Sequence, residues 1–160
     1  GLTDMVYNKG TSVVVVVDNR TTAMTGHQDH PGTGRTLMGE ETYEASITDF
    51  GKACGVKRIR VVNPYKLQEC IDVLKEELEA PEPSLVISRA PCPLKKRQAV
   101  GTLRNIDPAK CKKCSKCARN CPVNAITGKV KNPYHIDPTV CIKCGACKEN
   151  CAFGAVYVEA

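Results

Sequence analysis

The sequence predicts a parallel α/β unit followed by a small, cysteine-rich α+β domain. Three observations support this prediction. Residues 1–94 contain three runs rich in β-branched residues, separated by segments with helical periodicity, as in α/β sheets. Residues 107–160 repeat one pattern with a period of 30 and hold eight of the 11 cysteines. Residues 1–94 carry 10 Lys or Arg and 13 Asp or Glu, whereas residues 95–160 carry 13 and 4, so the two modules differ in charge sign.

The predicted strands lie at residues 12–18, 59–62 and 84–88. The first contains five consecutive valines and is therefore apolar on both faces. This pattern predicts a central strand in a sheet that is covered on both sides. Because helical segments separate the three runs, we expect the strands to be parallel.

Two helices are predicted between these strands. Ser46, followed by Asp49 at the third position, resembles a capping box and begins a short helix that ends before Gly55. Asn63 is a favourable N-cap, and Pro64 suits the first helical position. The apolar residues that follow with a helical period are Leu67, Ile71, Leu74 and Leu78.

The predicted organisation is a first domain at 1–94, a linker at 95–106 and a second domain at 107–160. The linker begins with three consecutive basic residues. In the second domain Ile106-Asp107-Pro108 recurs as Ile136-Asp137-Pro138. Two stacked copies of one supersecondary unit are the simplest interpretation.

The composition excludes several classes of protein. Of the 160 residues, 42% are hydrophobic and 25% charged, which is typical of a globular protein. The longest apolar run, Val13 to Val17, is far shorter than the roughly 20 residues that span a bilayer. The first residues lack the basic region and apolar core of a signal peptide. We therefore expect no membrane association, a cytoplasmic location, and cysteines that act as ligands rather than in disulfides.

Each copy of the repeat has the spacing Cys-x2-Cys-x2-Cys-x3-Cys, which is that of bacterial ferredoxins with two [4Fe–4S] clusters. Three closely spaced cysteines wrap a loop around one cluster, and the fourth begins a segment that leads to the other. We therefore expect a two-cluster ferredoxin-like domain. One cluster would be held by Cys111, Cys114, Cys117 and Cys151, and the other by Cys141, Cys144, Cys147 and Cys121.

A zinc module is the alternative interpretation of these cysteines. Zinc sites usually use two pairs of ligands, whereas each copy here begins with a run of three cysteines. A zinc-dependent nucleic-acid binder would suit the basic half, but only Tyr134, Phe153 and Tyr157 could stack on bases there. We expect no nucleic-acid partner. The nine Lys and Arg between Lys110 and Lys148 would dock an acidic electron carrier or form an ordinary solvated surface.

The small second domain has few large apolar side chains. We therefore expect its folding to depend on the clusters. The remaining cysteines lie outside the repeat. Cys54 and Cys70 are expected to be small core residues, and no ligand role is assigned to Cys92. His135 is expected at the surface.

A polar loop at 18–32 follows the valine-rich strand and contains two of the three histidines. Open α/β sheets bind ligands beyond the carboxyl ends of their strands. Amide and carbonyl oxygens in such a loop suit Mg²⁺ shared with a phosphate. The alternative is an ordinary turn-rich loop.

The stretch Val13–Val17 followed by Asp18 to Gln28 resembles the second half of the thiamine diphosphate motif. Together with the cysteine repeat, it resembles the alpha subunit of the indolepyruvate:ferredoxin oxidoreductase family, which ends in a two-cluster ferredoxin domain. The resemblance covers essentially the whole chain. It implies that the α/β unit is part of a thiamine diphosphate-binding domain.

The resemblance also implies particular roles for residues of the loop. Asn19 would ligate Mg²⁺ through its side chain and Thr21 through its backbone carbonyl. Thr22, Gly26 and His27 would lie near the diphosphate or the thiazolium. The family motif opens with a Gly-Asp pair that is not found upstream of Asn19. The domain that carries the activating Glu is also missing, so we expect a C-terminal fragment that is inactive alone.

The expected function is oxidative decarboxylation of aryl 2-oxoacids, such as indolepyruvate, to acyl-coenzyme A, with electrons passing through both clusters to ferredoxin. The implied partners are the preceding part of the same subunit, a beta subunit, ferredoxin, the 2-oxoacid and coenzyme A. The alternative is a non-catalytic electron-transfer module joined to an α/β partner-binding domain. Binding of thiamine diphosphate distinguishes the two.

Overall fold

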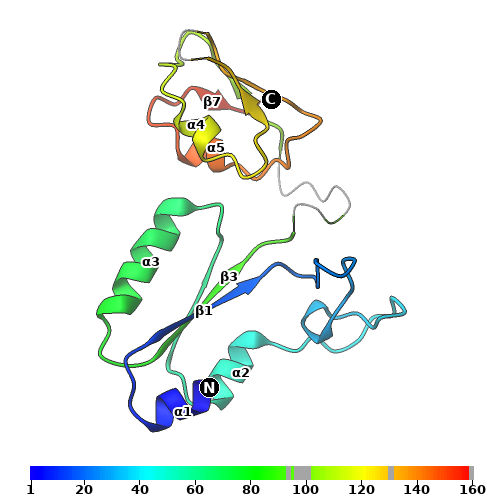
Figure 1. Cartoon of the computed structure of the whole chain (residues 1–160), viewed down its shortest axis with the longest axis vertical. Helices are drawn as coiled ribbons and strands as arrows, with labels where there is room; N and C mark the ends of the chain where they lie inside the picture. The colour runs from blue at the N-terminus through cyan, green and yellow to red at the C-terminus, as the bar shows by residue number, and fades with distance from the viewer. Residues whose placement is uncertain (93–94, 96–101, 130–131, 159–160) are drawn as a thin grey trace. The chain divides into compact units, whose positions relative to one another are not determined.

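The computed structural model describes residues 1–92, 95, 102–129 and 132–158. The chain divides into two compact units, residues 1–95 and 96–160, each described here by itself (Figure 1). The elements of the first unit are α1 (Leu2–Tyr7), β1 (Val13–Asp18), the 3-10 turn η1 (Pro31–Thr33), α2 (Ile47–Ala53), β2 (Arg58–Val62), α3 (Leu67–Glu79) and β3 (Ser84–Arg89). Those of the second are β4 (Asn105–Ile106), α4 (Lys116–Arg119), β5 (Ile126–Thr127), β6 (His135–Ile136), α5 (Ala146–Glu149) and β7 (Val156–Tyr157).

The first unit contains a parallel sheet in the order β1-β3-β2, which confirms the predicted α/β class. The prediction that the valine-rich strand is central was wrong. Strand β3 has hydrogen-bonded neighbours on both sides, and Leu85, Val86 and Ile87 within it are 2, 1 and 0% exposed. In β1, by contrast, Val15 and Val17 are 48 and 78% exposed. A β-branched run predicts a strand, but its place in the sheet depends on which strands pair with it.

Helices pack on both faces of this sheet. On one face Leu85 and Ile87 pack with Val56 and with apolar residues of α1 and α2. On the other face Val62 and Val86 pack with Val73 of α3. Figure 1 shows α3 on one side of β1 and β3, and α1 and α2 on the other. Strands β1 and β3 pair in parallel up to their carboxyl ends, where Asp18 lies beside Arg89.

Helix α2 matches its prediction. The Oγ of Ser46 accepts a hydrogen bond from the backbone N of Asp49 at 3.2 Å, as a helix N-cap does. Gly51 lets the helix approach the sheet, because a Cβ there would lie 2.6 Å from Cδ2 of Leu85.

Helix α3 differs from its prediction at its start and in its buried face. The Oδ1 of Asn63 accepts from the backbone N of Tyr65 at 3.0 Å, so Asn63 and Pro64 form a turn, and the helix begins at Leu67. Leu78 is 69% exposed, whereas Glu77 is fully buried. The reason is an ion pair, because Nε of Arg58 on β2 lies 2.8 Å from Oε2 of Glu77.

The second unit contains two antiparallel two-stranded ladders, β4 with β7 and β5 with β6. This is the architecture expected of a small α+β repeat. Residues 105–106 of the predicted linker form β4, while residues 96–101 lie outside the described part of the chain. The buried apolar side chains are few and mostly small: Ala125, Ile126, Tyr134, Ala146, Ala155 and Val156. In the described residues, no helix has the length and apolar character needed to cross a membrane.

Candidate cluster cavities and cofactor loop

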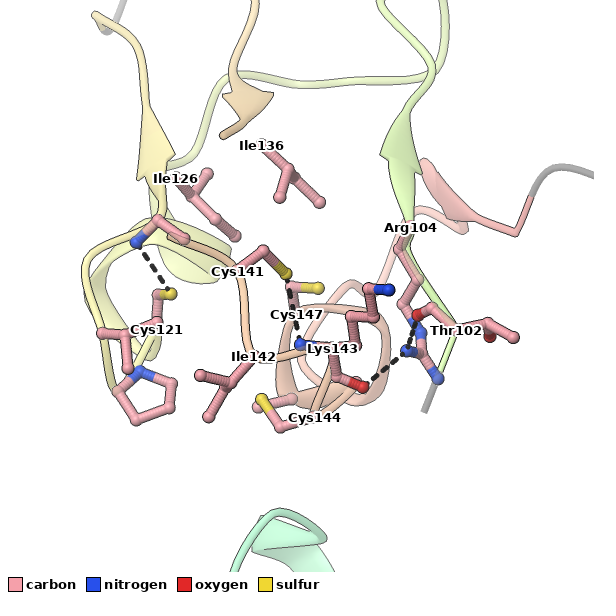
Figure 2. A pocket seen from close by; sticks show the side chains of 15 residues that line it. Thr102, Arg104, Cys121, Ile126, Ile136, Cys141, Ile142, Lys143, Cys144 and Cys147 are labelled. Atoms are coloured by element: carbon pink, nitrogen blue, oxygen red, sulfur yellow. Dashed lines mark hydrogen bonds between the residues drawn. The ribbon is translucent and has the colours of Figure 1, made fainter. Parts of the chain in front are cut away.

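The second unit contains two cavities, each lined by four cysteines. Cavity A, about 350 Å³ including its part open to solvent, is lined by Cys111, Cys114, Cys117 and Cys151. Cavity B, about 360 Å³ on the same basis, is lined by Cys141, Cys144, Cys147 and Cys121 (Figure 2). These are the two sets predicted from the spacing. In each set, three cysteines come from one repeat and the fourth comes from the other.

The backbone between the cysteines explains how three sulfurs reach one cavity. Lys113 and Ser115 in the first loop, and Lys143 and Gly145 in the second, have positive φ angles of 56, 65, 60 and 84°. Left-handed residues tighten a turn, so each loop winds around its cavity. The short helices α4 and α5 follow the second cysteine of their repeats, and Asn120 and Asn150 are their C-cap residues. Cys121 and Cys151 come next, so each is placed at the opposite cavity.

Backbone amide groups already point at some of these sulfurs. The N of Ala125 donates to Sγ of Cys121 at 3.3 Å, and the N of Lys143 donates to Sγ of Cys141 at 3.4 Å. Figure 2 shows both contacts at cavity B. Donors directed at sulfur stabilise thiolates and, in iron–sulfur proteins, help set the reduction potential.

Three of the eight thiols have a raised pKa, which favours their neutral form. Burial raises the pKa of Cys117 and Cys144, and the charges of neighbouring cysteines raise it further. Burial and the nearby Cys144 raise the pKa of Cys147 to about 11, although Arg104 opposes the rise. A metal centre binds thiolates, so its binding would release protons.

The donor set suits an iron–sulfur cluster. Each cavity offers four soft sulfur ligands, the ligation that [4Fe–4S] clusters use. Within the described ranges, no three His, Cys, Asp or Glu side chains are arranged to hold a metal ion. The fit to a cluster therefore rests on the four sulfurs that line each cavity.

The polar loop of the first unit begins at the carboxyl end of β1. Asp18 is 6% exposed and accepts from Nε of Arg89 at 2.7 Å and from the backbone N of Arg20 at 3.0 Å. Burial raises the pKa of Asp18, but these hydrogen bonds outweigh it and hold the pKa below its usual range. Arg20 also reaches Oε1 of Glu44 at 3.1 Å. These ion pairs tie the start of the loop to β3 and to the segment before α2.

The loop brings the five predicted cofactor residues into one hydrogen-bonded segment. The Oδ1 of Asn19 accepts from the N of Thr21 at 3.1 Å. The buried Thr21 donates its hydroxyl to the carbonyl of Gln28 at 3.2 Å, and the N of Thr22 donates to the same carbonyl at 3.0 Å. The segment between Thr22 and Gln28 is thereby closed into a loop.

Gly26 and His27 lie inside this closed loop. Their φ angles are 120 and 62°, and His27 is therefore in a conformation uncommon for a non-glycine residue. The Nε2 of His27 is buried and has no hydrogen-bond partner in the described part of the chain. A buried nitrogen without a partner is costly, so this position suits a bound polar group.

Sequence reasoning missed three residues that organise these sites. Asp18 ends the first predicted strand and Arg89 directly follows the third, and parallel pairing places them side by side. Arg104 lines cavity B. The only indication in the sequence is that Arg104 precedes Tyr134 by one repeat length.

Comparison with known proteins defines the class of protein. Residues 1–88 match the family described as thiamine pyrophosphate enzyme, C-terminal TPP binding domain. Residues 110–155 match the family described as 4Fe-4S dicluster domain. The chain belongs to the thiamine pyrophosphate enzyme family and combines its C-terminal cofactor-binding domain with an iron–sulfur domain.

The similarity extends to particular relatives named indolepyruvate oxidoreductase subunit IorA. The chain is 38% identical over 125 residues to that of Methanothermobacter marburgensis, covering 78% of this chain and 20% of the relative. It is 41% identical over 123 residues to that of Methanothermobacter thermautotrophicus, covering 76% and 20%. It is 35% identical over 158 residues to that of Archaeoglobus fulgidus, covering 78% of this chain and 25% of the relative. The chain therefore spans a fifth to a quarter of the length of these relatives, and its expected resemblance to the C-terminal part of this subunit is confirmed.

Proposed function

We propose that the protein takes part in the oxidative decarboxylation of aryl 2-oxoacids, with indolepyruvate as the expected substrate. In this reaction the 2-oxoacid loses CO₂ and its acyl carbon joins the sulfur of coenzyme A. Two electrons pass singly to ferredoxin, and one proton is released. The observation that carries this proposal is the pair of four-cysteine cavities, each built from both repeats, in a chain that belongs to a thiamine enzyme family.

The residues of this chain would contribute binding and orientation. The cysteines of cavities A and B would each hold one [4Fe–4S] cluster. The Asn19 side chain and the Thr21 carbonyl would ligate Mg²⁺, with Thr22, Gly26 and His27 near the diphosphate or the thiazolium. When bound, thiamine diphosphate supplies carbanion stabilisation and the clusters supply one-electron transfer. The hard oxygen donors of the loop and the buried, unpartnered Nε2 of His27 support this assignment.

The proposed partners are the preceding part of the subunit, a beta subunit, coenzyme A and ferredoxin. Ferredoxin would approach the basic second unit, whose lysines and arginines favour an acidic carrier. We propose a cytoplasmic location, with no nucleic-acid or membrane partner.

The test uses the intact protein with its partner subunit under anaerobic conditions, loaded with iron, sulfide, Mg²⁺ and thiamine diphosphate. Visible absorption is followed as indolepyruvate and coenzyme A are added, and dithionite is added last. We expect the 2-oxoacid to bleach the cluster absorption and to reduce added ferredoxin. Phenylpyruvate and pyruvate in parallel test the preference for aryl substrates. Bleaching by dithionite alone would contradict the proposed reaction.

A non-catalytic electron-transfer module is the second candidate. It is favoured by one observation, that all eight cysteines of the two cavities lie within the second unit. Such a module would bleach with dithionite and would not bind thiamine diphosphate. Calorimetric titration with thiamine diphosphate and Mg²⁺ therefore separates the two candidates.

A further inference from the structure

Arg104 and Tyr134 occupy equivalent positions of the two repeats and line different cavities. Arg104 immediately precedes β4, and Tyr134, thirty residues later, immediately precedes β6. Arg104 lines cavity B, and Tyr134 lines cavity A. The repeat therefore places a cation at one cavity and a neutral phenol at the other.

Tyr134 is electrically neutral, and its hydroxyl group already has a hydrogen-bond partner. Its hydroxyl lies 2.7 Å from Oγ of Ser115, and the side chain is buried. The phenol therefore forms part of the wall of cavity A without adding a charge.

Arg104 is held in place by backbone oxygens. Its Nη1 donates to the carbonyl of Thr102 at 2.8 Å and to that of Lys143 at 3.2 Å (Figure 2). Gly145 makes room for the guanidinium, because a Cβ there would lie 2.8 Å from Nη2. The equivalent residue of the first repeat is Ser115, which instead meets Tyr134.

The Nε of Arg104 is buried and has no hydrogen-bond partner among the residues described. A guanidinium donor left unpaired in a buried position is costly unless an acceptor occupies the cavity beside it. Cavity B is lined by thiolate-forming cysteines, so the acceptor that fits is an anionic group bound among them.

Lysines near the cavities do not cancel this difference. Lys112 and Lys116 line cavity A, but both are exposed, so water and salt screen their charges. Arg104 is half-buried and its Nε is shielded from water. A charge at low local dielectric acts far more strongly on a neighbouring group than an exposed one.

We propose that Arg104 makes the cluster in cavity B the higher-potential cluster of the two. Reduction adds one negative charge inside the cavity, and a fixed cation with a free donor beside it stabilises that charge. Electrons delivered to the second unit then reside first at cavity B. This inference rests on the proposed function, because it requires a cluster in each cavity.

The test is a redox titration of the intact, iron-loaded protein, followed by electron paramagnetic resonance. The variants are Arg104→Gln, Arg104→Lys and, as the matched control, Tyr134→Phe. We expect Arg104→Gln to weaken electron affinity in the higher-potential step about tenfold, which is 59 mV for a one-electron couple. Arg104→Lys should fall between wild type and Arg104→Gln. Tyr134→Phe should leave this step in place, and Cys144→Ser should alter or abolish the same step.

The outcomes separate this proposal from the proposed function. If substitution of Arg104 shifts neither reduction step, or shifts both equally, the role of Arg104 is overturned and the cluster assignment stands. The absence of any one-electron step would overturn the cluster assignment and this proposal with it. If Arg104→Gln loses iron, the potential of the higher step in Arg104→Lys tests the proposal instead. The lysine ammonium keeps the charge but cannot place a donor where Nε lies. A lower potential for that step in Arg104→Lys supports the proposal, and an unchanged potential overturns it.

Discussion

Asn120 and Asn150 stand at the same position of the two repeats and face each other, with Nδ2 of Asn120 3.4 Å from Oδ1 of Asn150. Asn150 is buried, and its own Nδ2 donates to the carbonyl of Ala146 at 2.8 Å. The ends of α4 and α5 therefore lie together. The next residues are Cys121, which lines cavity B, and Cys151, which lines cavity A. Neither cavity is therefore complete without both repeats.

This crossing predicts which pairs of cysteine substitutions act together. Cys121→Ser with Cys144→Ser affects cavity B alone and should leave about half of the iron bound. Cys114→Ser with Cys121→Ser lies within one repeat but affects both cavities, so most of the iron should be lost. Iron per chain measures both. Retention of half the iron in the same-repeat pair would show that each repeat ligates its own cluster.

Removal of iron should unfold the second unit and spare the first. The second unit buries few apolar side chains, and metal-binding energy is folding energy in such domains. The first unit has its own core around Leu85 and Ile87. Hydrogen exchange before and after chelation should show lost protection in residues 102–158 and retained protection in β3. Persistent protection of the second unit would refute the dependence on clusters.

Asn19→Ala should weaken thiamine diphosphate binding at least about tenfold in the presence of Mg²⁺, by analogy with the loss of a supporting metal contact. Asn63→Ala is the matched control, because Asn63 accepts from Tyr65 as Asn19 accepts from Thr21, at 3.0 and 3.1 Å. Asn19→Asp keeps the oxygen donor and should bind better than the Ala variant. Calorimetry on the intact protein measures all three. Equal losses for Asn19→Ala and Asn63→Ala would point to folding rather than ligation.

Glu77→Gln should destabilise the first unit by roughly 1.5–3 kcal/mol, the value of a hydrogen bond to a charged group. The hydrogen bond from Arg58 outweighs burial and lowers the pKa of Glu77 from 4.5. This contribution is therefore complete above the unfolded pKa and is lost as pH falls through the lower folded value. Urea unfolding at neutral and acidic pH should show the two proteins converging in acid. A constant difference would exclude titration of Glu77 as its source.

Gly145→Ala should harm the second unit more than Gly154→Ala does. Both glycines have positive φ, 84 and 60°, so both substitutions incur about 1–2 kcal/mol of backbone strain. Only at Gly145 would the new Cβ meet Arg104, whereas nothing lies within 4 Å at Gly154. Iron retention during denaturant titration compares the variants. Equal retention would mean that the guanidinium moves aside freely.

Local patterns predicted the elements well, because each depends on nearby residues. The start of α2 follows from Ser46, and the parallel sheet follows from the alternation of strands and helices. The predictions failed where a distant residue decided the result. Arg58 on β2 selects Glu77 rather than Leu78 for burial on α3. Among the strands described, β3 rather than β1 lies between two others, and the valine run does not encode this order.

For the functional sites, the sequence alone determined which four cysteines line each cavity, because their spacing limits which sulfurs can surround one point. It also determined the position of the polar loop at 18–32, since loops follow strands in chain order. The tertiary structure alone decided what surrounds these sites: Arg89 beside Asp18, the unpartnered Nε2 of His27, and Arg104 at only one of the two cavities. Such contacts join residues far apart in the chain, and only the packing of the folded chain selects them.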